Sequence, residues 1–393
     1  MERKHILIEI LRALLFLSLG IPLFIFGLYG VITLYYGKLK KKEREGTSER
    51  NEKVEFEPFV SVVVPTHNEE MIVSKKIENI LASNYPREKL EIIFVDDSND
   101  STPEIIQEYS KRSPNIRLIR FHKRMGYSPS MIAGCKAAEG EIIVFNDAGS
   151  FLDAQAIPNL VANFRNSNIG VVTGNDVILN VDEEVGKSEN LYQKFYNFLR
   201  TAETRMDSTF YIKGEATAVR KDLIEDLGMC SETFDTTVGL FVRQKGYKTV
   251  YDPHVKFYEY TPLTHSGRTK QKTIRAANLV KVLWRFRHMM FKREYGKYGC
   301  IILPMNFAML VIAPLAILFG FIFLIGLTFF DLSFSTMAWG ILGSVFLFFL
   351  IFSRHLILTF LEFEYSLLKA LYQVLFTRKT HDKIEKVIST RRC

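Results

Sequence analysis

One stretch of the sequence, Glu91–Thr102 (EIIFVDDSNDST), constrains the fold more than any other. Its four consecutive apolar residues, 92–95, predict a strand buried on both faces, as in a parallel sheet covered by helices. The strand ends at Asp96 and Asp97, and the polar residues that follow are typical of a turn and a helix cap. Ligands of open α/β sheets bind beyond the carboxyl ends of the strands, so these carboxylates indicate a small-molecule site. Two helix-capping acids are the alternative.

The neighbouring segments repeat this order of strand, polar loop and helix. The loop PTHNEE follows one buried apolar run, and Asn146 and Asp147 follow another. Such alternation implies right-handed crossovers and predicts an α/β fold with a parallel sheet. The polar strand ends should then meet at one edge. The expected strands are 60–64, 92–95, 116–121 and 142–145, and the expected helices are 71–82, 103–112, 130–138 and 236–245.

Apolar residues concentrate near both ends of the chain. Three uncharged runs, 13–36, 301–330 and 334–352, each have about the length that crosses a bilayer. The first run is long and lacks a small-residue cleavage site, which argues against a secretory signal. Because Lys and Arg cluster beside the runs, at 38–44, 292–297 and 378–386, we expect these flanks to be cytoplasmic. The sequence thus predicts a multi-pass cell membrane protein with a cytoplasmic soluble domain.

The charge and the cysteines fit this view. The net charge of +8 does not indicate nucleic acid as a partner, because the basic residues follow the apolar runs and form no aromatic-interleaved patch. The four cysteines are scattered without metal-ligand spacing, as suits a reducing compartment. Two basic amphipathic stretches, 187–205 and 271–293, favour the interface with membrane lipids. Packing against the soluble domain is the alternative.

No glycine-rich phosphate loop follows any expected strand, since neither GxGxxG nor GxxxxGK[ST] occurs there. The acids are therefore expected to handle phosphate through a divalent cation that bridges carboxylate and diphosphate oxygens. This favours a metal-bound nucleotide as leaving group over a kinase or a dinucleotide oxidoreductase.

Five motifs in order, VSVVVPTHNEE, IIFVDDSNDST, EIIVFNDAGSFLD, YIKGEATAVRKDLI and TFDTTVGLFVRQKGY, resemble the family 2 glycosyltransferases. These are inverting, nucleotide-sugar-dependent enzymes with a GT-A fold. The flanking helices are similar to those of the membrane-embedded branch, which includes hyaluronan, chitin and cellulose synthases and polyprenyl-phosphate and lipid glycosyltransferases. The resemblance implies a Rossmann-like, mostly parallel sheet in a cytosolic domain, joined to transmembrane and interfacial helices.

The domain organisation that follows has six parts. They are an N-terminal transmembrane helix at 1–37, a charged linker at 38–57, the GT-A domain at 58–265, interfacial helices at 266–299, two transmembrane helices at 300–363 and a basic cytosolic tail at 364–393.

For the nucleotide, the resemblance implies that Thr66 and Glu69 line the nucleoside pocket. It also implies that Asp97, with Asp96, contacts the base or ribose. Arg124 occupies a loop in which relatives carry a basic residue near the nucleotide, although a solvated surface arginine is the alternative.

For the metal, Asp147 takes the place of the first acid of the family's DxD motif, and Gly149 takes the place of the second. One carboxylate holds Mg²⁺ or Mn²⁺ less firmly than two. Asn146, His254 or His265 could supply a further ligand, and a weak or absent metal requirement is the alternative.

For the chemistry, Asp235 corresponds to the acid that serves as general base on the acceptor hydroxyl. Phe234 stands where the family usually has Glu, and a helix-capping aspartate is the alternative. Lys213, Gly214 and Glu215 take the place of acceptor contacts, with an ordinary turn as the alternative.

The QxxRW signature of processive synthases is incomplete in this sequence. Gln271 is in place, but Ile274 and Arg275 occupy the Arg and Trp positions. Arg275 could still provide a cation near the departing diphosphate.

The expected function is transfer of a sugar from a UDP- or GDP-sugar to a lipid-linked or saccharide acceptor at the cytoplasmic membrane face. A processive polysaccharide synthase and a catalytically inactive membrane scaffold remain as alternatives.

Overall fold

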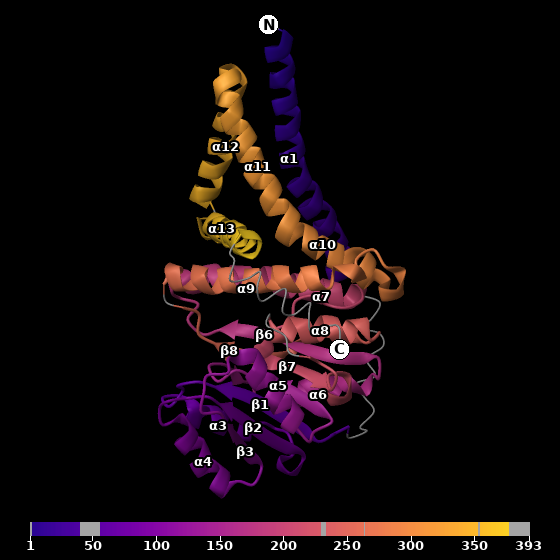
Figure 1. Ribbon diagram of the computed structural model, residues 1–393, viewed down its shortest axis with the longest axis vertical. Coiled ribbons are helices and arrows are strands. Elements are labelled where there is room, and N and C mark those ends of the chain that lie inside the picture. The colour runs from indigo at the N-terminus through magenta and orange to yellow at the C-terminus, as the bar shows by residue number, and fades with distance from the viewer. Residues whose placement is uncertain (1, 40–55, 229–232, 263, 353, 377–393) are drawn as a thin grey trace.

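The computed structural model describes residues 2–39, 56–228, 233–262, 264–352 and 354–376. An α/β domain occupies one end of the molecule and long apolar helices occupy the other (Figure 1). Between them lie two long helices, α7 (Glu184–Met206) and α9 (His265–Arg285). The expectations for linker residues 40–55 and for the basic tail after residue 376 lie outside the described residues and stay predictions.

One mixed sheet forms the centre of the α/β domain, with the strand order β3-β2-β1-β4-β7-β6-β8-β5. Its parallel pairs are β1 with β2 and β4, β2 with β3, and β6 with β8, whereas β7 and β5 run antiparallel to their neighbours. The mostly parallel α/β fold is thereby confirmed. The strands are β1 Val60–Thr66, β2 Leu90–Asp96, β3 Ile116–Arg120, β4 Ile142–Phe145, β5 Phe151–Leu152, β6 Ile169–Ile178, β7 Thr217–Arg220 and β8 Lys248–Glu259.

Helices cover both faces of this sheet, which explains why its strands are apolar on both sides. Alternate residues of β1 separate into two cores: Val62 and Val64 face α3, α4 and α6, whereas Val63 faces α5 and α8. Gly134 of α5 packs so closely on β1 that a Cβ there would lie 2.3 Å from Val63 Cγ1. These helices are α3 Val73–Leu81, α4 Thr102–Arg112, α5 Tyr127–Ala137, α6 Ala156–Ala162 and α8 Phe234–Gln244.

The register brings the expected polar strand ends to one edge. Thr66 at the end of β1 pairs with Asp96 at the end of β2, and Val63 pairs with Phe145, the last residue of β4. The residues that follow these strands therefore emerge side by side, as expected for adjacent parallel strands.

The layer of α7 and α9 joins the sheet to the apolar helices. Glu203 of α7 accepts hydrogen bonds from Tyr29 of α1 at 2.5 Å and from Asn306 of α10 at 2.8 Å. Arg268 of α9, 1% exposed, pairs with Glu189 of α7 at 2.7 Å and with Glu362 of α13. One side of each basic stretch thus packs within the protein, whereas apolar side chains such as Phe195 and Trp284 are exposed. The expected contact of these stretches with lipid stays a prediction. The helices of this end are α1 Glu2–Leu34, α10 Leu303–Phe307, α11 Ala313–Phe330, α12 Leu332–Phe352 and α13 Arg354–Phe376.

Two helical segments among the described residues are long and apolar enough to cross a membrane, Glu2–Lys38 and Tyr298–Phe330. The second is continuous through two π-helical turns, Tyr298–Ile302 and Ala308–Ile312. A further apolar segment among the described residues, Leu332–Phe348, belongs to α12. The described residues therefore contain two candidate spans, and the third expected crossing stays a prediction.

Candidate active site

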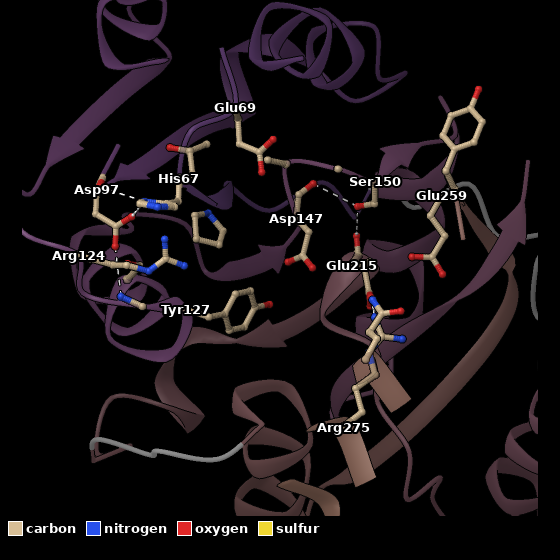
Figure 2. A pocket seen from close by; sticks show the side chains of 18 residues that line it. His67, Glu69, Asp97, Arg124, Tyr127, Asp147, Ser150, Glu215, Glu259 and Arg275 are labelled. Carbon is tan, nitrogen blue, oxygen red and sulfur yellow. Dashed lines mark hydrogen bonds and ion pairs between the residues drawn. The ribbon is translucent and has the colours of Figure 1, made fainter. Parts of the chain in front are cut away.

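A cavity of about 380 Å³ opens at the edge where the parallel strands end. Figure 2 shows side chains from the loops after β1, β2 and β4 on one side and from β8 and α9 on the other. Eight of the residues singled out from the sequence line it: Thr66, Glu69, Asp97, Arg124, Asp147, Glu215, Gln271 and Arg275. Residues that lie 209 positions apart along the chain thus share one crevice.

The two aspartates after β2 differ in their roles. Asp97 lines the cavity, where Met125 N–H donates to its Oδ2 at 2.7 Å and His67 Nδ1 lies 2.7 Å from its Oδ1. Burial opposes ionisation of Asp97, but the backbone N–H groups of Met125 and Gly126 outweigh it, so its pKa is lowered. Asp97 is therefore a fixed anion in the crevice.

Asp96 does not line the cavity and is fully buried. Its carboxylate accepts hydrogen bonds from Thr66 Oγ1 at 2.8 Å and from Ser98 Oγ at 2.6 Å. Asp96 thus connects the ends of β1 and β2. The structure places it outside the cavity lining, where it supports the site and does not reach the expected nucleotide contact.

Asp147 follows β4 and faces the middle of the crevice (Figure 2). Its Oδ1 is buried and has no hydrogen-bond partner among the described residues. Burial raises the pKa of Asp147, and repulsion from Glu215 raises it further, whereas the hydrogen bond from the Tyr127 hydroxyl lowers it. The resulting pKa is about 7. A carboxylate in this state is poised to accept a cation.

Behind the Asp147 loop lies a buried lysine. Lys76 of α3 is 0% exposed, and its ammonium donates to the carbonyl oxygen of Ser150. Burial lowers its pKa to about 7, although the charge of Asp147 opposes this. Lys76 therefore supports the loop from below without reaching the cavity lining.

Asp235 lies in the first turn of α8, next to the turn Gly214–Ala216. Gly214 N–H donates to Asp235 Oδ2 at 2.9 Å, while Asp235 Oδ1 is buried without a partner among the described residues. Burial and the carboxylate of Glu215 raise the pKa of Asp235 to about 7. A carboxylate with a pKa near neutral pH is suited to act as a general base.

Close packing around Gly214 holds the backbone that contacts Asp235 in place. A Cβ on Gly214 would lie 2.6 Å from the hydroxyl of Tyr127, so only glycine fits there without a shift. Gly214 does not line the cavity but holds the Asp235 carboxylate through its N–H. The structure thus places it behind the crevice wall and not at the expected acceptor contact.

The three residues expected at the acceptor separate in the structure. Lys213 is 2% exposed and its Nζ lies 2.5 Å from Asp176 and 3.7 Å from Glu259, inside a buried charge network. Only Glu215 of the three lines the cavity, where its Oε1 lies 3.2 Å from Arg275 of α9. Lys213 therefore belongs to the support of the site.

The expected histidine ligands lie away from Asp147. His254 is exposed on β8 and outside the cavity lining, and its carbonyl oxygen accepts from Asn159 of α6. His265 is exposed at the start of α9 and is also outside the lining. The structure brings neither to the crevice, so we do not retain them as ligands.

A divalent cation fits the donor set that remains. No group of three or more His, Cys, Asp or Glu side chains that could hold a metal occurs within the described ranges. The crevice nevertheless offers hard carboxylate oxygens, including the unpartnered Oδ1 of Asp147, and Mg²⁺ and Mn²⁺ prefer such ligands while keeping waters.

Several functional residues gave no clear sequence signal. His67, Tyr127, Ser150 and Glu259 all line the cavity. His67 lies within the recognised motif PTHNEE, so the motif itself could have indicated it. Glu259 is the last residue of β8. Burial and repulsion from Glu215 raise its pKa to about 7, although the attraction of Lys213 opposes this. Its place in the site depends on the pairing of β8 with β6, which is nonlocal.

Comparisons with known proteins agree with this geometry. Residues 61–228 match Glycosyl transferase family 2. The chain is 27% identical over 242 residues to poly-beta-1,6-N-acetyl-D-glucosamine synthase of Staphylococcus aureus (strain COL), covering 60% of this chain and 58% of that relative. It is 26% identical over 251 residues to the probable glycosyltransferase YdaM of Bacillus subtilis (strain 168), with the same coverage of 60% and 58%.

One solved structure is similar over almost the whole chain. It is the mannosyltransferase PcManGT from Pyrobaculum calidifontis in complex with GDP-Man and Mn²⁺, with a TM-score of 0.73, 23% identity and coverage of 95% of this chain and 99% of that one. At this identity the likeness shows the fold. The protein thus has a GT-A-like fold, and its residues 61–228 are similar to the glycosyltransferases of family 2.

Proposed function

We propose that the protein is an inverting glycosyltransferase that moves a sugar from a UDP- or GDP-sugar to a lipid-linked or saccharide acceptor at the cytoplasmic face of the cell membrane. The observation that carries this proposal is that Asp97, Asp147 and Glu215 line one crevice. Asp235, 138 positions after Asp97, lies just behind its wall, where it interacts with Glu215 and Asp147. The family match over residues 61–228 supports the nucleotide-sugar donor.

The donor's nucleoside binds at the ends of β1 and β2. Asp97, held ionised by backbone N–H groups, accepts hydrogen bonds from the base or ribose, with Thr66 and Glu69 beside it. Arg124 is exposed at the mouth of the crevice and contributes a positive charge there.

The donor's diphosphate lies between Asp147 and Arg275. The cavity lining includes five carboxylates, on Glu69, Asp97, Asp147, Glu215 and Glu259, but only two guanidinium groups, on Arg124 and Arg275. Such a crevice repels a bare diphosphate. Mg²⁺ or Mn²⁺ held by Asp147 would neutralise the leaving group, and Arg275 adds a fixed charge at the same place. The similar solved structure contains GDP-Man and Mn²⁺, which supports the use of a divalent cation in general.

Asp235 acts on the acceptor. Its free Oδ1 accepts the proton of the acceptor hydroxyl while the oxygen attacks the anomeric carbon, and the nucleoside diphosphate leaves from the opposite face. One displacement of this kind inverts the anomeric centre. Gly214 N–H keeps the other oxygen of the base in place throughout.

The two candidate spans expose an apolar surface that fits a membrane. Only 28% and 33% of the most apolar parts of the two candidate spans are buried within the protein, unlike core helices of soluble proteins. Large apolar side chains such as Leu23 (74% exposed) and Phe329 (80% exposed) face outward there. Lipid would cover this surface and hold the crevice near the bilayer.

A processive polysaccharide synthase is the second candidate, because the matched Staphylococcus aureus relative is by name a poly-beta-1,6-N-acetyl-D-glucosamine synthase. The chain spans 58% of that relative, and Arg275 stands where processive enzymes carry Trp, so we place this candidate second.

The test uses the full-length protein in lipid nanodiscs with radiolabelled GDP-mannose or UDP-N-acetylglucosamine, offered a polyprenyl phosphate or an oligosaccharide. Transfer with inversion to either acceptor, followed by NMR of the new linkage, supports the proposal. A ladder of products favours the synthase. A protein that binds neither nucleotide sugar and releases no nucleoside diphosphate would be an inactive scaffold, and the proposal would fall.

A further inference from the structure

Gly149 stands where a second metal-binding acid would be expected. It is exposed, and nothing lies within 4 Å of the position that a Cβ would take. Steric crowding therefore does not explain why the position lacks a side chain. Since a second carboxylate strengthens the hold on a hard divalent cation, the question is which residue of this chain supplies it.

Glu215 enters the same crevice from a different segment and is held to the Asp147 loop. Asn146, just before Asp147, donates its side-chain N–H to the carbonyl oxygen of Glu215 and also to Ser150 Oγ at 3.0 Å. Ser150 Oγ lies 3.5 Å from the same Glu215 oxygen. Asn146 is 0% exposed and Ser150 1% exposed, so this brace is shielded from water. The two acids therefore lie in a fixed relation to each other (Figure 2).

The carboxylates around this brace outnumber their positive neighbours, which are Arg275 and, for Asp147, also Lys76. Asp147 Oδ1 and Asp235 Oδ1 are both buried without a hydrogen-bond partner among the described residues, and Asp235 is only 9% exposed. Glu215 is 8% exposed, and its Oε1 has one cationic neighbour, Arg275 at 3.2 Å. Buried polar atoms are normally paired, so unpartnered carboxylate oxygens that are repelled by a third carboxylate are suited to a cation.

We propose that Glu215 supplies the second carboxylate ligand of the divalent cation, in place of the acid missing at position 149. This inference rests on the proposed function, which brings the cation and a diphosphate into the crevice together. When the donor binds, Arg275 moves from Glu215 to the diphosphate, and Glu215 turns to the cation. Each group exchanges one oppositely charged partner for another, so no buried charge is left unpaired.

The test measures Mn²⁺ binding to the full-length protein in detergent with GDP or UDP present, from the loss of the free Mn²⁺ signal in electron paramagnetic resonance. Glu215→Gln should weaken Mn²⁺ binding by at least about tenfold, as loss of a ligand does. Glu259→Gln removes a carboxylate from the same crevice and is the matched control, with an expected change below about threefold.

A rescue variant makes the test specific. Because position 149 has open space, an aspartate fits there, and Glu215→Gln combined with Gly149→Asp should return the Mn²⁺ affinity to within about threefold of the wild type. A structural role of Glu215 would not be rescued from position 149. Thermal unfolding of each variant confirms that it is folded.

Two results would overturn the inference while leaving the proposed function intact. One is unchanged Mn²⁺ affinity in Glu215→Gln, and the other is an equal loss in Glu259→Gln, which would reveal a general charge effect. Failure of the wild type to bind GDP or UDP at all would instead refute the proposed function.

Discussion

Replacing Asp235 with asparagine should remove the general base and leave the crevice folded. Asp235 Oδ2 accepts the N–H of Gly214 at 2.9 Å, and the side-chain oxygen of asparagine can take over that bond. The amide group then occupies the place of the unpartnered Oδ1 and removes one charge from a set of mutually repelling carboxylates. We therefore expect no loss of thermal stability in Asp235→Asn.

The expected loss is in the chemical step. A positioned general base contributes a factor of about 10² to 10⁴, which corresponds to about 2.7 to 5.5 kcal/mol in the activation barrier. The assay is release of nucleoside diphosphate at saturating donor and acceptor, with donor affinity measured separately by calorimetry. The donor Kd should stay within about threefold, because Asp235 acts on the acceptor.

Thr236→Val is the matched control for this change. Thr236 is fully buried beside Asp235 in the same helical turn, and its hydroxyl has no partner among the described residues. Loss of that hydroxyl should alter kcat by less than about threefold. If Asp235→Asn keeps kcat within tenfold of the wild type, or loses no more than Thr236→Val, then Asp235 is not the base.

The pH dependence provides a second readout of the same group. Burial and Glu215 raise the pKa of Asp235 to about 7, and only the ionised form accepts a proton. The value of kcat/KM should therefore rise with pH through neutrality, falling about tenfold per pH unit on the acid side. Asp147 also has a pKa of about 7 and interacts with the same neighbours, so the measured midpoint belongs to the group as a whole. A profile that falls with rising pH near 7 would contradict this assignment.

Three further changes test the nucleotide site, the core and the link to the apolar helices. Asp97→Ala should weaken GDP or UDP binding by about 1.5 to 3 kcal/mol in calorimetry, since it removes a charged acceptor; an unchanged Kd would place the nucleoside elsewhere. Gly134→Ala forces a Cβ to within 2.3 Å of Val63 and should lower the free energy of unfolding by about 1 to 3 kcal/mol, whereas Gly149→Ala, in open space, should not; equal urea midpoints would refute this. Glu203→Ala leaves buried donors of α1 and α10 unpaired and should lower the Tm in detergent by several degrees, while a Tm equal to the wild type would show that this link does not hold the layers together.

The sequence was most informative where a strand is a continuous apolar run. The runs in β1, β2 and β4 are buried on both faces, so their identity as strands followed from composition. Their parallel direction followed from the alternation of strands with helices. By contrast, the apolar character of β8 is interrupted by the exposed residues Pro253 and His254, and its partner β6 lies about 80 positions earlier. No local pattern reveals such a pairing, which explains why Glu259 was not anticipated.

The site was predictable to the extent that it follows strand ends. Asp97 and Asp147 line the cavity as their positions implied. Residue type alone was a poorer guide: His254 is an exposed residue on β8, and Lys213 points into a buried network with Asp176. Whether a polar residue faces a cavity or a neighbouring ion depends on packing partners from distant segments, and the sequence does not state these.

The crevice is completed outside the segment that carries the family match. Residues 61–228 supply Asp97, Asp147 and Glu215, but Glu259 and Arg275 of the cavity lining come later in the chain. Asp235, which lies next to the lining, also comes later. Arg275 lies on α9 two turns after Arg268, which is paired with both α7 and α13. Residues seven apart share a helix face. The helix α9, which places Arg275 over the crevice, is therefore held in position by α7 and α13. The segment that carries the family match therefore lacks both the proposed base and the cation over the diphosphate. We expect activity to require the chain through α13.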